Sequence, residues 1–179
     1  YGDLSAHGNP VLKTPNLDRL RAESVRFVDF QVSPTCAPTR SALLTGRHEF
    51  KNGITHTILE RERLALGAAT LAEQLQKAGY RTGIFGKWHL GNPNGKNQSS
   101  ADTLPLAHGF DEWLGTNVSH DYSNAQLLKS DAEGTRPIQG YSIIAKNLPS
   151  KHDLCASLTG RSTEAALSFI KSNKDKPFF

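Results

Sequence analysis

The sequence contains no methionine, only two cysteines and no long apolar run. No stretch approaches the roughly 20 consecutive apolar residues that a membrane-spanning helix needs, so we expect no membrane span within it. The two cysteines, Cys36 and Cys155, could form one disulfide at most, and neither a C-x-x-C pair nor zinc-site spacing occurs. The chain begins at Tyr1 without an initiator methionine and ends on the apolar pair Phe178-Phe179, so we expect an internal piece of a longer protein.

Charged residues are present but are not concentrated. The formal net charge is +4, charged residues make up 21% of the sequence, and lysine and arginine form no block. Nucleic-acid binding would need a basic patch interleaved with aromatic residues, so we expect no nucleic-acid partner, whereas a small anionic substrate is compatible with this charge. With 37% apolar residues in a chain of 179, one ordinary globular domain is the expectation.

The residues around Cys36 predict a short helix. Pro38 fits the first helical turn, where a missing N–H costs nothing, and Gly46 fits the left-handed conformation that often ends a helix. We therefore expect a loop followed by a helix from about Ala37 to Thr45. If this helix begins at or just before Cys36, the side chains of Cys36 and Arg40 lie on one face beside its positive end.

This placement favours the binding of a tetrahedral oxyanion. A thiol-derived group, a guanidinium fork and free backbone N–H groups would converge at one point. A lone C-x-x-x-R is also compatible with a buried structural cysteine at the start of an amphipathic helix. The phosphatase loop C-x-x-x-x-x-R is excluded by spacing, because position 42 is Ala42.

Helices and strands are predicted to alternate along the first half of the chain. We expect helices over residues 15–24 and 71–78, the second introduced by a capping box of Thr70 and Glu73. The β-branched and aromatic content of residues 25–32 and 80–85 predicts strands. Such alternation is typical of an α/β sheet with parallel neighbours, whose active sites gather outside the carboxyl ends of the strands.

The last part of the chain predicts one more helix and one more strand. Ser162 or Thr163 is expected to cap a helix with Phe169 and Ile170 on its core face, and Pro177 to open a final strand. Weak patterning or alternating charge predicts loops and solvated segments at residues 60–63, 92–100 and 122–160.

A second polar cluster follows the strand predicted over residues 80–85. If the backbone after Gly86 stays extended, Lys87 and His89 project to the same side and place a cation and an imidazole on one pocket wall. An isolated K-x-H pair is more often a lysine lying along the surface and a hydrogen-bonded core histidine. The later triplet Ser119-His120-Asp121 is equally compatible with a turn.

These strings, taken whole, resemble the signatures of the type I sulfatases. C-A-P-T-R-S-A-L-L-T-G-R is similar to the first signature and G-Y-R-T-G-I-F-G-K-W-H-L-G to the second, about 50 residues further on. The segments H-G-F-D and S-H-D resemble the family as well. The resemblance implies an α/β, alkaline-phosphatase-like fold with a mixed, mostly parallel sheet flanked by helices. It identifies residues 1–179 as the N-terminal part of a sulfatase catalytic domain, truncated at both ends.

The resemblance also implies a chemistry. In the family, the cysteine of C-x-P-x-R is oxidised to formylglycine, whose hydrate attacks a sulfate ester beside one bound calcium ion. Carried over to this chain, the modified Cys36 is the nucleophile and a metal ligand, and Arg40 and Lys87 neutralise charge. His89 takes a proton, and Lys87 and Ser119 contact the sulfate. The other calcium ligands are expected outside this chain, which alone is expected to be inactive.

The partners implied by the resemblance are a small-molecule or glycan sulfate ester and a formylglycine-generating maturation enzyme. Family habit predicts export to the periplasm, the lysosome or the outside of the cell. Two alternatives stay open. A phosphonate or phosphate monoester hydrolase of the same superfamily can use the same cysteine motif, and a non-catalytic, sulfatase-like binding protein would leave Cys36 unmodified.

Overall fold

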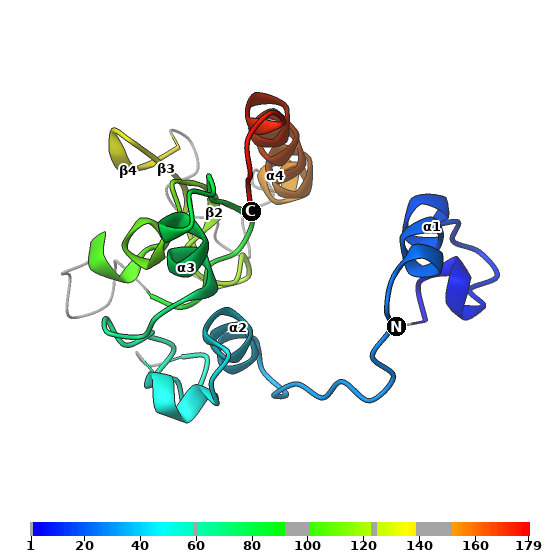
Figure 1. Cartoon of the computed structure of the whole chain (residues 1–179), viewed down its shortest axis with the longest axis horizontal. Helices are drawn as coiled ribbons and strands as arrows, with labels where there is room; N and C mark the ends of the chain where they lie inside the picture. Colours follow the sequence, from blue (N-terminus) through cyan, green and yellow to red (C-terminus); the bar gives the residue numbers. More distant parts are fainter. Residues whose placement is uncertain (1, 59–60, 92–100, 123–124, 139–151) are drawn as a thin grey trace. The chain divides into compact units, whose positions relative to one another are not determined.

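A computed structural model describes residues 2–58, 61–91, 101–122, 125–138 and 152–179 of the chain (Figure 1). Two compact units make up the chain, Tyr1–Val32 and Ser33–Phe179, and each is described by itself. The loop predicted at residues 92–100 lies outside the described residues.

The first unit is a small polar assembly around one carboxylate. It contains a 3-10 turn, η1 (Ser5–His7), and the helix α1 (Pro15–Glu23), which confirms the helix predicted over residues 15–24. Asp18 of α1 accepts hydrogen bonds from the hydroxyl of Ser5 at 2.5 Å and from that of Thr14 at 3.0 Å. These hydrogen bonds lower the pKa of Asp18, because they favour its charged form, and the bond from Ser5 has the largest effect.

The strand predicted over residues 25–32 is wrong. This segment has no regular secondary structure, and Val25, Phe27 and Val28 are 85%, 77% and 84% exposed. Its β-branched and aromatic residues fit a half-buried pleated surface, but that preference acts only where a neighbouring strand supplies hydrogen bonds and packing. None of the described strands pairs with this segment.

The helices of the second unit begin with the one predicted at the cysteine motif. The helix α2 runs over Cys36–Thr45 and ends at Gly46, whose φ of 65° is the left-handed conformation expected there. The helix α3 (Leu71–Lys77) starts with the predicted capping box, in which Thr70 and Glu73 exchange hydrogen bonds. Three 3-10 segments complete the short elements: η2 (Glu49–Asn52), η3 (Ala101–Thr103) and η4 (Pro105–His108).

A four-stranded mixed sheet forms the centre of this unit, in the order β1 (Gly83–Phe85), β2 (Glu112–Thr116), β3 (Leu127–Asp131) and β4 (Gly134–Pro137). β1 and β2 are parallel, and β3 pairs antiparallel with both β2 and β4. Near the chain's end, Arg81 and Phe178 form a further parallel bridge, where a strand was predicted to open. The predicted α/β arrangement of a mixed sheet flanked by helices is thereby confirmed, but the described strands are not mostly parallel as predicted, because two of their three pairings are antiparallel.

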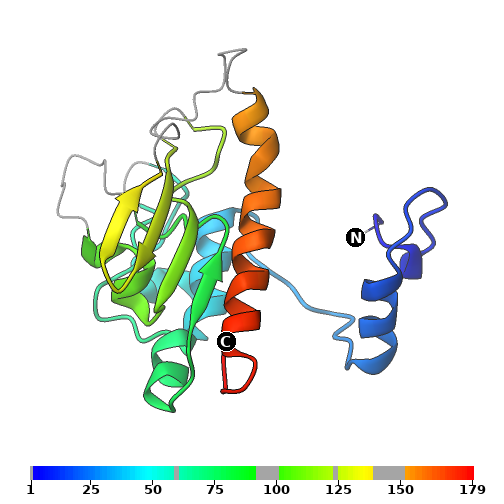
Figure 2. The ribbon, with the colours of Figure 1, turned by 90° about the horizontal axis from the view of Figure 1, so that it is seen from above.

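The last helix, α4 (His152–Asn173), begins ten residues before the position expected from Ser162. It runs beside β1 and β2 (Figure 2). Phe169 packs against Phe85 with ring centroids 5.5 Å apart, whereas Ile170, predicted to face the core, is 44% exposed. Cys155 and Leu158, in the earlier half of the helix, pack on the buried pair Val118 and Ala125. Tertiary contacts thus hold the helix before Gly160, a residue of weak helix propensity.

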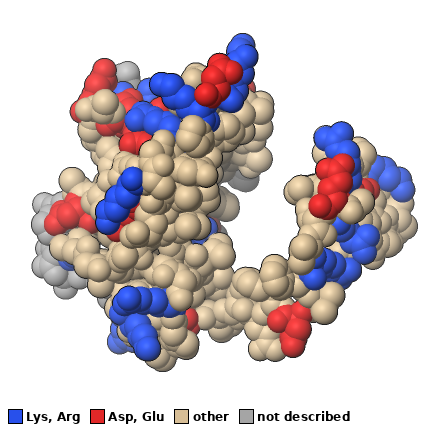
Figure 3. Space-filling model, in the orientation of Figure 1, with Lys and Arg blue, Asp and Glu red and all other residues tan. Residues whose placement is uncertain are grey.

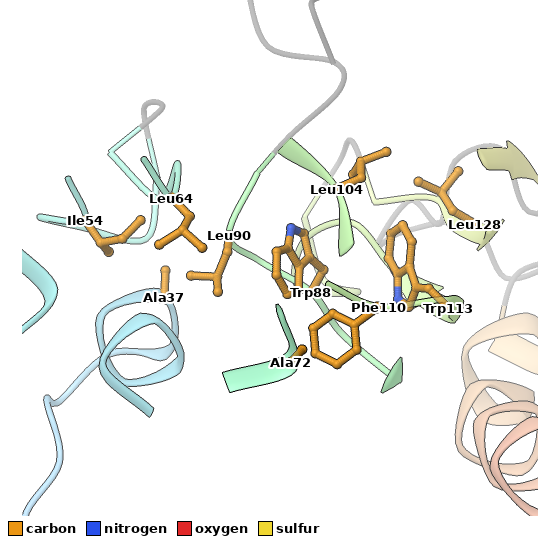
Figure 4. Packing of buried hydrophobic residues seen from close by; sticks show 10 residues of the cluster. All are labelled: Ala37, Ile54, Leu64, Ala72, Trp88, Leu90, Leu104, Phe110, Trp113 and Leu128. Atoms are coloured by element: carbon orange, nitrogen blue, oxygen red, sulfur yellow. The ribbon is translucent and has the colours of Figure 1, made fainter. Parts of the chain in front are cut away.

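The hydrophobic core lies between α2 and the sheet, with Trp88 near its middle (Figure 4). The indole N–H of Trp88 donates to the carbonyl of Thr103 at 2.8 Å, so the buried ring leaves no polar atom unpaired. Gly115 of β2 lies against the backbone of Gly86. A Cβ at position 115 would stand 1.6 Å from the carbonyl oxygen of Gly86, so a residue with a side chain does not fit there. The buried members of the core are Ala37, Ile54, Leu64, Ala72, Trp88, Leu90, Leu104, Phe110, Trp113 and Leu128.

One imidazole in this core has an unusual environment. His108 is fully buried and lies 5.7 Å from the ring of Trp88, and neither of its ring nitrogens has a hydrogen-bond partner among the described residues. Burial lowers the pKa of His108, while the charge of Glu73 acts in the opposite direction. Desolvation disfavours the imidazolium form, so His108 is neutral in the folded chain.

This environment predicts an acid-sensitive contribution to stability. Because the folded pKa of His108 lies below the ordinary value of about 6.5, the unfolded state binds its proton first. The free energy of unfolding therefore keeps its full value above about pH 6.5 as far as His108 is concerned, and it falls as the pH drops below that value. We expect His108→Phe to reduce the pH dependence of the unfolding free energy in that window, by at most about 1.4 kcal/mol per pH unit.

Urea titrations of the intact protein between pH 5 and 8 measure this slope. The exposed His56, changed to Phe, is the matched control and should leave the slope as it is. If the pH dependence of the unfolding free energy is unchanged in His108→Phe, then folding does not make the imidazole release its proton and the prediction is wrong.

Candidate active site

Two predicted motifs meet at the N-terminal end of α2. Cys36 is the first residue of that helix, and its Sγ lies 3.2 Å from Nδ1 of His89, which follows β1 in the second motif. His89 has a φ of 57° and is the one residue other than glycine among those described with a positive φ. This left-handed conformation turns its ring into the protein, where it is fully buried.

The condition under which Lys87 and His89 would project to the same side, an extended backbone after Gly86, is not met at His89. Gly86 and His89 both have positive φ values, so the chain bends where an alternating strand pattern was expected. Lys87 consequently lines a separate cavity, while His89 points to Cys36. The two side chains do not form one pocket wall, although the charge of Lys87 still acts on the imidazole of His89.

The hydrogen bonds of His89 define its tautomer. Nε2 lies 2.9 Å from the backbone carbonyl oxygen of Thr57, and a carbonyl can only accept a hydrogen bond. Nε2 must therefore carry the proton, which leaves a lone pair on Nδ1 of the neutral ring. The thiol of Cys36 then donates to Nδ1, so the imidazole is placed as a base toward residue 36.

The electrostatic environment keeps this imidazole neutral. The pKa of His89 is lowered to about 4, first because burial disfavours the charged ring and then because Lys87 repels a second positive charge. The bond to Thr57 and the charge of Asp121 act in the opposite direction, and Arg40 lowers the pKa further. His89 is consequently an uncharged proton acceptor throughout the neutral pH range.

Arg40 holds the two motifs together through the backbone. Its Nε donates to the carbonyl of Trp88 at 2.7 Å, and its Nη2 donates to the carbonyl of Lys87. Burial lowers the pKa of Arg40, and Cys36 opposes that shift. Cys36 and Arg40 do lie one turn apart on α2, as predicted, but the guanidinium is engaged with carbonyl oxygens.

Lys87 lies at the wall of a cavity between the sheet and α4. The cavity has a volume of about 480 Å³, and His120 lines it together with Lys87. Hydroxyl groups reach it from α4, and apolar side chains from the strands. Ser119 lies in a turn, where its carbonyl accepts the N–H of Tyr122 at 3.0 Å. Its contact with a sulfate group stays a prediction.

Two features near His89 were not found from the sequence. Thr57 acts through its carbonyl, for which no side-chain pattern exists. Tyr122, which packs on His89, directly follows the triplet Ser119-His120-Asp121, whose Asp121 contributes its charge to the same imidazole. Glu62, predicted to be solvated, is only 5% exposed, and its Oε2 has no hydrogen-bond partner in the described ranges.

The described residues do not fit a calcium ion. Within residues 2–58, 61–91, 101–122, 125–138 and 152–179, no three His, Cys, Asp or Glu side chains gather as metal ligands. Calcium takes six to eight oxygen ligands, so the group derived from Cys36 would not hold it alone. No step below depends on a metal.

Surface charge and helix hydropathy are unremarkable in the described part of the chain. Lysine and arginine side chains lie beside acidic ones on the face drawn in Figure 3, with broad uncharged areas between them. Among these residues, no helix combines the length and the apolar character that crossing a membrane requires.

Comparison with known proteins places the chain in a family. The family model described as Sulfatase matches residues 1–179. The chain is 47% identical over 133 residues to arylsulfatase A of Bos taurus, a match that covers 72% of this chain and 25% of the bovine protein. It is 36% identical over 201 residues to N-acetylgalactosamine-6-sulfatase of Homo sapiens, covering 100% of this chain and 35% of the human protein.

A solved structure has the same fold. The PsFucS1 sulfatase from Pseudoalteromonas sp. superimposes with a TM-score of 0.76 at 24% sequence identity, over 99% of this chain and 40% of that chain. The predicted alkaline-phosphatase-like fold is thereby confirmed. The chain spans about a quarter to a third of the length of the two curated relatives. Because the family model matches the chain over its whole length, the chain belongs to the sulfatase family.

Proposed function

We propose that the protein hydrolyses a sulfate ester at residue 36 after Cys36 has been converted to formylglycine. One observation carries the proposal: the thiol of Cys36 stands 3.2 Å from the unprotonated Nδ1 of a neutral, buried His89. Family membership supplies the class of reaction, since the two curated relatives named above are both sulfatases.

The sulfur of Cys36 stands in for an oxygen of the hydrated aldehyde, because both are attached to the same side-chain carbon. In the first half-reaction, one hydroxyl of the hydrate attacks the sulfur atom of the ester. The bond between sulfur and the ester oxygen breaks, and the alcohol leaves with the proton that the attacking hydroxyl gives up, so the sulfate group stays on residue 36.

In the second half-reaction, the remaining hydroxyl loses its proton. Nδ1 of His89 accepts that proton, since its lone pair faces residue 36 within hydrogen-bond distance. The bond between the carbon and the sulfate oxygen then breaks, sulfate leaves, and the aldehyde re-forms. Water adds to the aldehyde, and the proton passes from His89 to solvent, so each turnover consumes one water molecule.

Lys87 and Arg40 have different parts in this proposal. Lys87 lines a cavity together with His120, apart from the contact between His89 and Cys36, so we assign its ammonium group the attraction of an anionic substrate toward the site. Charge stabilisation by such a group is worth most in a site shielded from water. Arg40 instead fixes the backbone of residues 87–88, so we assign it the positioning of Lys87 and His89.

The remaining parts of the proposal rest on family membership. We propose a sulfated sugar or another small sulfate ester as substrate, a maturation enzyme that oxidises Cys36, and export from the cytoplasm. The names of the two curated relatives support the substrate class alone. Calcium binding and a sulfate contact of Ser119 remain predictions.

The first test is the chemical state of residue 36. Digestion of the intact protein with trypsin should release the peptide 27–40, which ends at Arg40. After expression with a formylglycine-generating enzyme, mass spectrometry should show that one oxygen has replaced the thiol sulfur and two hydrogens. An intact thiol would sink the aldehyde mechanism and favour a non-catalytic binding protein.

The second test separates the aldehyde hydrate from a simple hydroxyl nucleophile. In Cys36→Ser, the serine hydroxyl can still attack the ester, but the sulfated product has no second hydroxyl on the same carbon. We expect at most one equivalent of alcohol per enzyme and a sulfate adduct on residue 36, both seen by rapid quench and mass spectrometry. Continued turnover would mean that water cleaves the adduct directly, as the alternative phosphatase-like mechanism requires.

The third test concerns the assignment of Arg40. Arg40→Lys keeps the charge but cannot donate to two carbonyls with a planar fork, so we expect a loss of about 1.5–3 kcal/mol in unfolding free energy. Arg47→Lys, at the exposed end beyond the same helix, is the matched control and should cost less than about 0.5 kcal/mol. Equal stability of the two variants in urea titrations would contradict the positioning role.

A further inference from the structure

The cavity beside Lys87 lies where parallel strands end. Lys87 follows β1 and Thr116 ends β2, and both line the cavity together with residues from the middle of α4, which runs beside these strands (Figure 2). The edge beyond the carboxyl ends of parallel strands is where α/β sheets bind their ligands. The cavity volume of about 480 Å³ falls in the range of roughly 300–1,000 Å³ that small organic ligands occupy. It therefore has room for the ring of a ligand as well as for an anionic group.

Apolar side chains make up one part of the cavity wall. Phe85, Leu127, Leu158 and Leu167 reach the cavity from β1, β3 and α4. Leu167 is 61% exposed, so a ring that packs against it would remove apolar surface from water. This part of the wall favours the organic portion of a ligand over a bare inorganic ion.

The polar part of the wall favours an anion. Lys87 and His120 line the cavity, and none of its described lining residues is an aspartate or a glutamate. Lys87 is half-buried, and no ion pair or hydrogen bond joins its ammonium group to another described residue. The hydroxyl of Ser162 is likewise without a partner among these residues, whereas that of Thr163 donates to the carbonyl of Thr159 at 2.8 Å. A cation and a hydroxyl donor are thus both available to a ligand.

From these features we propose that the cavity is a subsite for a second anionic group of the substrate. This group is a carboxylate or a sulfate on an apolar ring, and it is distinct from the ester that reacts at residue 36. The ammonium of Lys87 pairs with it, the hydroxyl of Ser162 donates to it, and the ring packs on the apolar wall. The part of the cavity in substrate selection rests on the proposed function, whereas the binding of such an anion does not.

The position of the cavity suits a substrate with two anionic groups. Lys87 and His89 are two residues apart, and two residues of chain span at most about 7 Å. Because the imidazole of His89 contacts Cys36 while Lys87 lines the cavity, the reacting ester and the second anionic group would occupy neighbouring places. One substrate molecule therefore reaches both places when its two anionic groups lie at opposite ends of a single ring.

The experiment is a calorimetric titration of the intact protein with naphthalenesulfonate, an apolar ring with one anionic group and no ester bond to hydrolyse. We expect one equivalent to bind. Lys87→Gln should weaken binding by at least about tenfold, and Ser162→Ala by about threefold, because a charged and a neutral hydrogen bond are lost. Cys36→Ala should leave binding unchanged, since residue 36 does not line the cavity. Naphthol, which is neutral, should bind equally to the parent protein and to Lys87→Gln.

Lys171→Gln and Ser168→Ala are the matched controls, because both residues are exposed on α4 and neither lines the cavity. They should bind naphthalenesulfonate as the parent does. Absence of binding by the parent, equal losses in the controls, or a loss in Cys36→Ala as large as that in Lys87→Gln would overturn the proposal. If circular dichroism shows that Lys87→Gln is unfolded, Ala166→Leu replaces it: this change fills the cavity from α4, so weaker binding supports the proposal and unchanged binding contradicts it.

Turnover gives a second, separate readout. Two aryl sulfates that differ only in one charge, para-carboxyphenyl sulfate and para-carbamoylphenyl sulfate, are compared. We expect kcat/KM to favour the carboxylate by at least about tenfold in the parent protein, mainly through KM, and Ser162→Ala to reduce that preference. Turnover of both esters without a preference would contradict the role in substrate selection. If neither ester is hydrolysed, the proposed function fails, and the calorimetric titration still decides whether the cavity binds the anion.

Discussion

The contact between Arg40 and the backbone of residues 87–88 is the constraint on which the rest of the site depends. α2 and the segment after β1 are more than 40 residues apart in the sequence, and Arg40 joins them by donating to two successive carbonyl oxygens. A planar guanidinium suits this task, because its donors are fixed relative to each other. Since Trp88 lies in the hydrophobic core, the same contact ties the cysteine helix to the packed centre of the unit.

This constraint explains the unusual backbone of His89. The carbonyls of Lys87 and Trp88 face Arg40, and the N–H groups of Trp88 and His89 donate to carbonyls of residues 116 and 117. With the chain tied on both sides, the imidazole reaches Cys36 through a left-handed turn at His89 itself. A positive φ at a residue with a side chain is disfavoured by about 1–2 kcal/mol. The bonds on both sides and the burial of the ring offset that cost.

The local parts of this structure could be predicted from the sequence, and the non-local ones could not. Pro38, Gly46 and the pair Thr70 and Glu73 fix helix ends through short-range rules, and α2 and α3 start and stop within a residue of the expected positions. The strand predicted over residues 25–32 is absent because a strand forms only beside a partner strand, and no local sequence pattern shows whether that partner exists.

The candidate site likewise has local parts that could be predicted from the sequence and non-local parts that could not. The motifs indicated that Cys36 and Arg40 share one helix face and that His89 belongs near them. The carbonyl of Thr57 and the ring of Tyr122 come from segments without a recognisable pattern, and only the fold brings them to His89. The contacts of Arg40 with two carbonyls were not predicted for a related reason: the chemistry of a guanidinium suits an oxyanion and a carbonyl equally, and only the fold shows which carbonyls it meets.

The low pKa of His89 raises a question about its strength as a base, since a group that binds protons weakly removes them poorly. Part of the answer lies in the charge of Lys87, the second largest cause of the lowered pKa. An anion held beside Lys87 would offset that charge, and the imidazolium would then form at a lower free-energy cost. In the proposed reaction, the sulfate group on residue 36 would lie next to His89 itself, and its negative charge would act in the same direction in the half-reaction that needs the base. The free site would keep the ring neutral and its lone pair available, and once sulfate has left, the repulsion from Lys87 would favour release of the proton to solvent.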